Sequence, residues 1–134
     1  MSAASLMRTD FENALTTMPI GEAQRQFSPA LVRQIVLRDP NGIYAGIVPA
    51  AALHSVSNQD DELLGSLAQQ QDEYLLPTTP VREILKAFER SEADVLAVVD
   101  RPDHRATIGT LSEAHVLRTY GEELERRNQE LFSR

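Results

Sequence analysis

The sequence predicts an α+β fold made of two tandem units, each with the order β-α-β-β-α, related by a pseudo-twofold axis and followed by a C-terminal helical extension. The main observation is an internal repeat, in which similar residues recur about 61 to 63 positions apart. In each copy, a proline-led helix pattern precedes two β-rich runs and a second helix pattern. A unit of this size cannot bury a sheet alone, so we expect the two units to pack against each other.

The first helix of each unit is predicted from residues 18–27 and 79–88, which align at an offset of 61. Pro19 aligns with Pro80, and a glutamate follows each proline three residues later. Proline suits the first helical turn because its missing N–H would be unpaired there, and the glutamate complements the helix dipole. Both helices therefore have well-marked starts.

The strands come next. At an offset of 62, residues 34–40 align with residues 96–102, two β-rich runs that each close in an acidic residue and a proline. At an offset of 63, residues 44–53 align with residues 107–116, glycine on glycine. We interpret each change of offset as a single loop insertion, and we expect two strands, a tight turn and a second helix in each unit.

Between the units lies a polar, acidic linker in which Leu63, Leu64 and Leu67 would share one helical face, so a short helix is predicted there. The C-terminal tail is predicted to be helical, with an apolar stripe that either packs on its own core or meets a partner. The tail pairs are Glu122 with Arg126 and Glu123 with Arg127, and its stripe is Leu117, Leu124 and Leu131. The predicted organisation is a first unit at 1–56, a linker at 57–73, a second unit at 74–118 and a C-terminal helix at 119–134.

Composition limits the possible functions. A net charge of −7 would repel a phosphate backbone, so nucleic acid is not expected as a partner. The chain has no cysteine, its three histidines lack the spacing of metal ligands, and no nucleophile or phosphate-loop motif is present, so neither a metal site nor an enzyme is expected. No apolar run reaches the length of a membrane span and the start lacks a secretory leader, so we expect a soluble chain, with a cytoplasmic location as the prior expectation.

These patterns resemble a known family. One pattern occurs twice, each time after a proline-led helix: a strand, a glycine, two hydrophobic residues, a serine or threonine, and a helix. This pattern resembles the CBS-domain pair, or Bateman module, over nearly the whole chain. The stretches "YLLPTTPVREILKAFERSEADVLAVVD" and "GTLSEAHVLRTYGEELERRNQELF" are similar to the cytoplasmic C-terminal region of prokaryotic ClC-type chloride channels and transporters. The resemblance implies an excised cytosolic fragment of an inner-membrane protein, with "ASLMRTDF" as the first strand of the first unit. It also implies a membrane-domain partner, a homodimer and, in some members, an adenine nucleotide such as ATP, ADP or AMP.

In nucleotide-binding members, the motif glycine, two hydrophobic residues, threonine or serine, two residues and aspartate faces the cleft. In the second unit Ser112 keeps the hydroxyl, and His115 stands at the aspartate position, whereas the first unit has Pro49 and Ala52. Losing a carboxylate that makes charge-assisted bonds would weaken ribose binding by roughly tenfold to a hundredfold or more. His115 could still bond a ribose or, when protonated, contact a phosphate.

Each candidate site residue also has a structural interpretation. Ser112 could cap the following helix, and His115 could be a half-buried residue bonded to a backbone carbonyl. Thr9 and Asp10 lie where related modules contact a ligand from the opposite side of the cleft, or they form an ordinary cap or turn pair.

The leading hypothesis is a non-catalytic regulatory CBS pair of a ClC-type chloride channel or transporter. One alternative is a free-standing nucleotide-sensing module that acts on another protein in trans. A further alternative is a purely structural dimerisation element.

Overall fold

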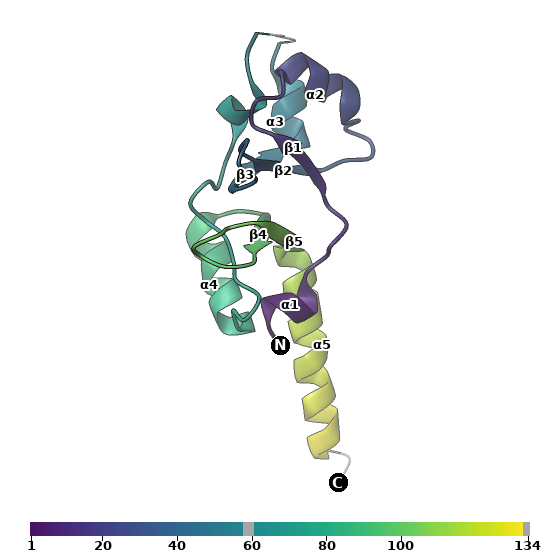
Figure 1. Cartoon of the computed structure of the whole chain (residues 1–134). Coiled ribbons are helices and arrows are strands. Elements are labelled where there is room, and N and C mark those ends of the chain that lie inside the picture. Colours follow the sequence, from purple (N-terminus) through teal and green to yellow (C-terminus); the bar gives the residue numbers. More distant parts are fainter. Residues whose placement is uncertain (58–60, 133–134) are drawn as a thin grey trace.

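Two β-sheets meet in the middle of the molecule, and helices cover the outer face of each sheet (Figure 1). The computed structural model describes residues 1–57 and 61–132. The first sheet has three strands and the second has two. Helix α5 (Glu113–Phe132) leaves the second unit and projects from the body (Figure 1). The α+β class, the two units and the C-terminal helix are therefore confirmed.

The strands alternate between two environments. In the first sheet, Ile35 and Leu37 pack toward the helices, whereas Val36 between them packs toward the other sheet. The second sheet follows the same pattern, and the two inner faces share one cluster of buried residues: Val36, Tyr44, Ile47, Ala97 and Val99. Strand β1 pairs in parallel with β2, while β2–β3 and β4–β5 are antiparallel. The bounds are β1 (Glu12–Leu15), β2 (Gln34–Arg38), β3 (Tyr44–Pro49), β4 (Val95–Val99) and β5 (Thr107–Ser112).

The two proline-led helices form as predicted, one residue later than the proline. Pro19 and Pro80 have extended backbone conformations, so each is the residue before its helix rather than the first helical residue. Helix α4 buries Ile84, Ala87 and Phe88, which are three and four residues apart and lie on one helical face. The bounds are α1 (Ala3–Leu6), α2 (Ile20–Gln26), α3 (Ala50–Ser55), the 3₁₀ helix η1 (Leu64–Leu67) and α4 (Val81–Ser91).

The strand register corrects the alignment of the repeat. Gln34 pairs with Pro49 in the first hairpin, and Val95 pairs with Ser112 in the second. The leading strands are therefore 61 residues apart, so the predicted offset of 62 is wrong, while the offset of 63 holds for the following strands. Both extra residues lie in the turn of the second hairpin, between β4 and β5. Sequence could not detect this because either alignment places apolar residues on apolar residues.

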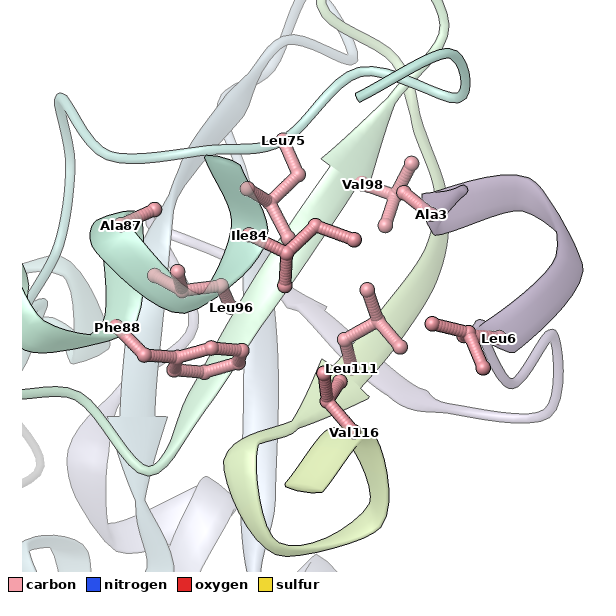
Figure 2. Close-up of a cluster of buried hydrophobic side chains, with 10 residues drawn as sticks. All are labelled: Ala3, Leu6, Leu75, Ile84, Ala87, Phe88, Leu96, Val98, Leu111 and Val116. Atoms are coloured by element: carbon pink, nitrogen blue, oxygen red, sulfur yellow. The ribbon is translucent and has the colours of Figure 1, made fainter. Parts of the chain in front are cut away.

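Each core contains a segment that crosses from the other side of the molecule. Ala3 and Leu6 of α1 pack into the core of the second unit (Figure 2), and Leu64 of η1 packs into the core of the first. The prediction of a strand entry at "ASLMRTDF" holds only in part, because residues 4–6 belong to α1, Arg8 forms a single bridge with Thr110, and β1 begins at Glu12. The cluster in Figure 2 consists of Ala3, Leu6, Leu75, Ile84, Ala87, Phe88, Leu96, Val98, Leu111 and Val116. The unit boundaries taken from the sequence stay predictions.

Two matching backbone bridges hold the crossing segments. Arg8 exchanges two hydrogen bonds of 2.9 Å with Thr110, and Gln69 exchanges bonds of 2.8 and 2.9 Å with Ile47. Arg8 and Gln69 are 61 residues apart, and Ile47 and Thr110 are 63 apart, so the two bridges correspond under the repeat. The repeat therefore extends into segments where the sequence comparison did not detect it.

The glycine-on-glycine match marks these crossings. A Cβ on Gly46 would lie 2.8 Å from the Gln69 carbonyl oxygen, and one on Gly109 would lie 2.8 Å from that of Arg8. Gly46 also has φ of +118°, in the region that favours glycine. Both positions thus need glycine because another backbone passes against them.

The linker differs from its prediction in one respect. Its short helix is the 3₁₀ helix η1, with Leu64 buried and Leu67 partly buried. Leu63 precedes the helix and is 44% exposed, so the predicted face of three leucines is wrong. Residues 58–60 of the predicted linker lie outside the described residues.

The C-terminal helix is continuous with the last helix of the second unit. Within it, Glu123 accepts hydrogen bonds of 2.6 and 2.7 Å from Arg126, and it lies 3.6 Å from Arg127. The expected pair of Glu122 with Arg126 is therefore wrong, whereas that of Glu123 with Arg127 is present. Residues 133 and 134 of the predicted tail lie outside the described residues.

The apolar stripe of α5 does not pack on the protein's own core. Leu117, Leu124 and Leu131 are 51%, 42% and 67% exposed. These side chains recur every seven residues along the projecting helix (Figure 1). Of the two alternatives for this stripe, packing on its own core is excluded.

Candidate functional site

Ser112 stands at the junction of β5 and α5. Its hydroxyl oxygen accepts a 3.2 Å hydrogen bond from the backbone N–H of His115, so the helix-cap interpretation is confirmed. The next residue, Glu113, donates its backbone N–H to the Asp94 carbonyl at 2.9 Å, and its carboxylate complements the helix dipole. The backbone N–H groups of Glu113 and His115 at the start of α5 therefore already have hydrogen-bond partners within the protein.

His115 is half-buried on the first turn of α5. Its Nδ1 lies 3.3 Å from a guanidinium nitrogen of Arg118, so the predicted carbonyl partner is wrong. Because a guanidinium can only donate, Nδ1 is the acceptor in this pair, and the neutral imidazole carries its proton on Nε2. The Nε2–H group is then the donor that His115 can offer to a ligand.

Thr9 and Asp10 are exposed and follow the bridge between Arg8 and Thr110. The bridge places Thr9 beside β5, the strand that ends at Ser112. The Asp10 carboxylate accepts hydrogen bonds of 3.2 and 3.3 Å from the Arg8 guanidinium, which hold the pKa of Asp10 below its usual value. Asp10 is thus occupied by Arg8, while Thr9 is exposed next to the bridge, and its role at a ligand site stays a prediction.

On the first unit's side, a cavity of about 120 Å³ lies between the two units. Pro49 takes the position of Ser112 and offers no hydroxyl. Two carboxylates, Glu92 and Asp94, line this cavity, and none of its lining residues is cationic, so it suits a neutral or cationic group better than a phosphate. The lining residues are Gln34, Ile47, Pro49, Gln69, Gln70, Glu92, Ala93, Asp94 and Val95.

Two of the corresponding positions on the second unit's side hold arginine. Arg8 corresponds to Gln69, and Arg33 corresponds to Asp94. The backbone supports this correspondence, because the carbonyls of Arg33 and Asp94 each accept a hydrogen bond from the first residue of the following helix, at 2.8 and 2.9 Å. The side with Ser112 therefore has arginines where the side with Pro49 has a glutamine and an aspartate.

The sequence motifs do not identify the charged residues of this region, which are Glu92 and Asp94 at the cavity and Arg8 and Arg33 on the second unit's side. The signal that could have found them is the offset of 61, applied to residues 2–9 and 31–33. That extension matches Ala3 with Leu64 and Leu6 with Leu67, and the two backbone bridges confirm it.

The histidines have separate partners in the part of the chain that the structure describes. His54 contacts the Phe27 carbonyl at 2.7 Å, and His104 contacts the Asp100 carboxylate at 2.5 Å. No group of three or more His, Asp or Glu side chains in residues 1–57 and 61–132 is placed to hold a metal ion. Within the same ranges, no helix combines the length and apolarity needed to cross a bilayer.

Comparison with known proteins gives similarity in structure but not in sequence. No family model matches the chain, and no curated protein matches it. A CBS domain pair/ACT domain protein from Thermotoga maritima is 18% identical with a TM-score of 0.73, over 92% of this chain and 99% of that one. The CBS domain pair of protein MJ0100, in complex with 5′-methylthioadenosine and S-adenosyl-L-methionine, is 15% identical with a TM-score of 0.74, over 92% and 98%.

A membrane-associated example is also similar. The cytosolic domain of the Mg²⁺ channel MgtE, in complex with ATP, is 20% identical with a TM-score of 0.74, over 88% of this chain. This chain spans 48% of that structure's length. At such identities the likeness shows the fold alone, and it confirms the architecture expected from the resemblance. The chain therefore has the fold of a CBS-domain pair.

Proposed function

We propose that this chain is a non-catalytic regulatory domain that binds an adenine nucleotide in the groove on the second unit's side. One observation carries the proposal: under the repeat, Ser112, Arg8 and Arg33 take the positions of Pro49, Gln69 and Asp94, which line the acidic cavity on the first unit's side, and His115 follows Ser112 on the first turn of α5. Structures of the same fold hold ATP in one case and 5′-methylthioadenosine with S-adenosyl-L-methionine in another, which supports this ligand class.

Each residue of the proposed groove has its own role in binding the nucleotide. Arg8 and Arg33 attract the phosphates, because a guanidinium binds phosphate oxygens through paired hydrogen bonds. The Nε2–H of His115 donates to a ribose oxygen, in place of the family's acid. Ser112 remains the helix cap, since its oxygen already accepts the N–H of His115. Thr9 and Asp10 border the groove, and Asp10 orients Arg8.

Regulation follows from the position of the groove between the units. A ligand that prefers one arrangement of the two sheets shifts the population toward that arrangement. Helix α5 begins directly after Ser112, so a change at the groove is carried directly into the projecting helix. The exposed stripe of Leu117, Leu124 and Leu131 then serves as the contact with a second copy of the chain in a homodimer.

The parent protein of our leading hypothesis is a ClC-type chloride channel or transporter of the inner membrane, with this domain on its cytosolic side. The alternative is a free-standing cytoplasmic module. Proteins of the same fold include both the cytosolic domain of a channel and a CBS pair joined to an ACT domain. The gene sequence upstream of Met1 decides between them: hydrophobic helices in frame support the channel, and an in-frame stop codon contradicts it.

Calorimetry with ATP, ADP, AMP and S-adenosylmethionine tests the binding site. We expect submillimolar binding of one nucleotide, weakened at least tenfold in Arg33→Gln and His115→Gln. The matched controls are Arg82→Gln on α4 and His104→Gln in the second hairpin turn, which should bind like the unmodified chain. Binding that ignores Arg33 and His115, or no binding of any nucleotide at millimolar concentration, contradicts the proposal.

Sedimentation equilibrium tests the dimer contact. Leu124→Glu places a charge in the middle of the α5 stripe and should shift the chain toward the monomer. Leu31→Glu is the control, because Leu31 is 87% exposed and is not part of α5. A monomeric unmodified chain, or equal effects of both substitutions, contradicts the assembly through α5.

A further inference from the structure

A second cavity, of about 220 Å³, opens at the hairpin end of the interface between the two sheets. It includes no residue of the two glycine-led motifs at the helix starts, so it is separate from the proposed nucleotide groove. At Gly42 an added Cβ would meet nothing within 4 Å, which places open space at this edge of the cavity. The lining residues are Phe11, Asn13, Val36, Arg38, Gly42, Ala106 and Thr107.

The pseudo-symmetric position on the other side of the interface is filled by side chains. Under the strand register, Tyr44 corresponds to Thr107, because they pair with Arg38 and Val99 at equivalent places in their hairpins. Tyr74 corresponds to Asn13, at an offset of 61. The filled side thus has Tyr44, Tyr74 and Val99. At the corresponding positions, the side with the cavity has Thr107, Asn13 and Arg38.

The filled side is tightly connected. The rings of Tyr44 and Tyr74 meet edge to face with centroids 6.3 Å apart, and the Arg105 guanidinium lies 5.8 Å from the Tyr74 centroid. Burial raises the pKa of the Tyr44 hydroxyl, which stays protonated and donates a 2.6 Å hydrogen bond to the Gln70 carbonyl. The repeat therefore closes one end of the interface and leaves the other end open.

The open side presents hydrogen-bond donors and a cation, without an acid. The Arg38 guanidinium donates to the Asn13 side-chain oxygen, which leaves the Asn13 amide N–H groups as further donors. The Thr107 hydroxyl oxygen is buried and has no hydrogen-bond partner among the described residues. A buried hydroxyl without a partner destabilises the fold, and rotation about the Cα–Cβ bond exchanges the hydroxyl and methyl positions. A ligand acceptor in the cavity would relieve this cost.

The remaining walls are apolar. Phe11 packs against the interface cluster, Val36 is buried beneath the cavity, and Ala106 presents only a methyl group. A dry apolar cavity of about 150 Å³ accommodates benzene. At about 220 Å³, this cavity has room for one ring and one small charged substituent.

We propose that this cavity is a second ligand site, which binds a small aromatic carboxylate. The ring lies between Phe11 and Val36, and the carboxylate accepts hydrogen bonds from Arg38, the Asn13 amide and the Thr107 hydroxyl. Because the cavity lies between the sheets, the ligand stabilises one relative position of the two units, independently of a nucleotide. The site exists on one side only, since the tyrosines exclude a ligand on the other.

Titration of the ¹⁵N-labelled chain with benzoate, followed by amide chemical shifts, tests this site. We expect saturable shifts at Asn13, Ala106 and Thr107, and at least tenfold weaker binding of benzyl alcohol, which keeps the ring but lacks the charge. Arg38→Gln should weaken benzoate binding by about tenfold or more, consistent with a charge-assisted bond of about 1.5–3 kcal/mol. Arg82→Gln on α4 is the control and should leave it unchanged.

Two substitutions at Thr107 separate filling of the cavity from loss of the hydroxyl. Thr107→Tyr copies the closed side and should abolish the shifts, whereas the isosteric Thr107→Val should weaken binding only severalfold. Equal binding of benzoate and benzyl alcohol, shifts that Arg38→Gln does not change, or no shifts at all overturns the proposal. Displacement of benzoate by AMP also overturns it, because the cavity would then belong to the nucleotide groove, whose own test depends on Arg33 and His115.

Discussion

The two units agree in their cores and differ along the surfaces where they meet. Phe27 and Phe88 occupy corresponding core positions and are 2% and 1% exposed. At the interface, Tyr44 corresponds to Thr107, and at the grooves Asp94 corresponds to Arg33. A buried position tolerates little change in volume, while a position that borders a cavity can change size or charge at small cost. The two copies of the repeat therefore keep the same core packing but differ in the side chains that border the cavities between the units.

The largest effects should come from the matched core phenylalanines. Phe27→Ala and Phe88→Ala should each lower the free energy of unfolding by about 3–5 kcal/mol, because each leaves a large buried cavity. Urea titration followed by circular dichroism measures both. Losses that differ by more than about 2 kcal/mol would show that the two cores are not equivalent in packing.

The glycines at the two crossings should come next and should differ. Gly46→Ala combines a positive φ with a Cβ 2.8 Å from a backbone oxygen, and should cost about 2–4 kcal/mol. At Gly109 the nearest atom is the flexible Met7 sulfur at 2.6 Å, although the Arg8 carbonyl follows at 2.8 Å, so Gly109→Ala should cost about 1–3 kcal/mol. Thermal unfolding of both variants ranks them, and the reverse order would contradict the strain assigned to Gly46.

The helix caps provide a smaller contrast. Ser112→Ala removes the bond to the N–H of His115 and should cost about 1 kcal/mol. Its counterpart Pro49 makes no side-chain cap bond, so α3 has no equivalent to lose. Urea unfolding measures the loss, with Ser66→Ala on η1 as the control. An unchanged stability in Ser112→Ala would show that the cap contributes nothing to α5.

The smallest effect is electrostatic. The Arg8 guanidinium lowers the pKa of Asp10, whereas the counterparts of this pair are Gln69 and Gln71. Because the folded pKa is lowered, the pair stabilises the fold above the ordinary carboxyl pKa, and this contribution is lost as pH falls through the folded value. Carbon-13 NMR titration should give a pKa for Asp10 below that of an ordinary aspartate, and this pKa should return toward the ordinary value in Arg8→Gln. An identical pKa in both forms would contradict the ion pair.

Much of the fold was predictable because it depends on local patterns. Pro19 and Pro80 mark two helices, and the runs around Val36 and Ala97 mark two central strands. The site was predictable only in part. Ser112 and His115 follow from the spacing of their motif, whereas Arg33 and Asp94 come from loops with no pattern of their own.

By itself, the sequence determined the α+β class, the two repeated units, the helix starts and the cap at Ser112, since each follows from periodicity or from interactions within a few residues. Tertiary structure alone decided that α1 joins the core of the second unit and η1 that of the first. It also decided that the tyrosines close one end of the interface while Thr107 leaves the other end open. These features depend on contacts between residues far apart in the chain. The burial of one segment is set by where a distant segment lies, and local sequence patterns do not contain that information.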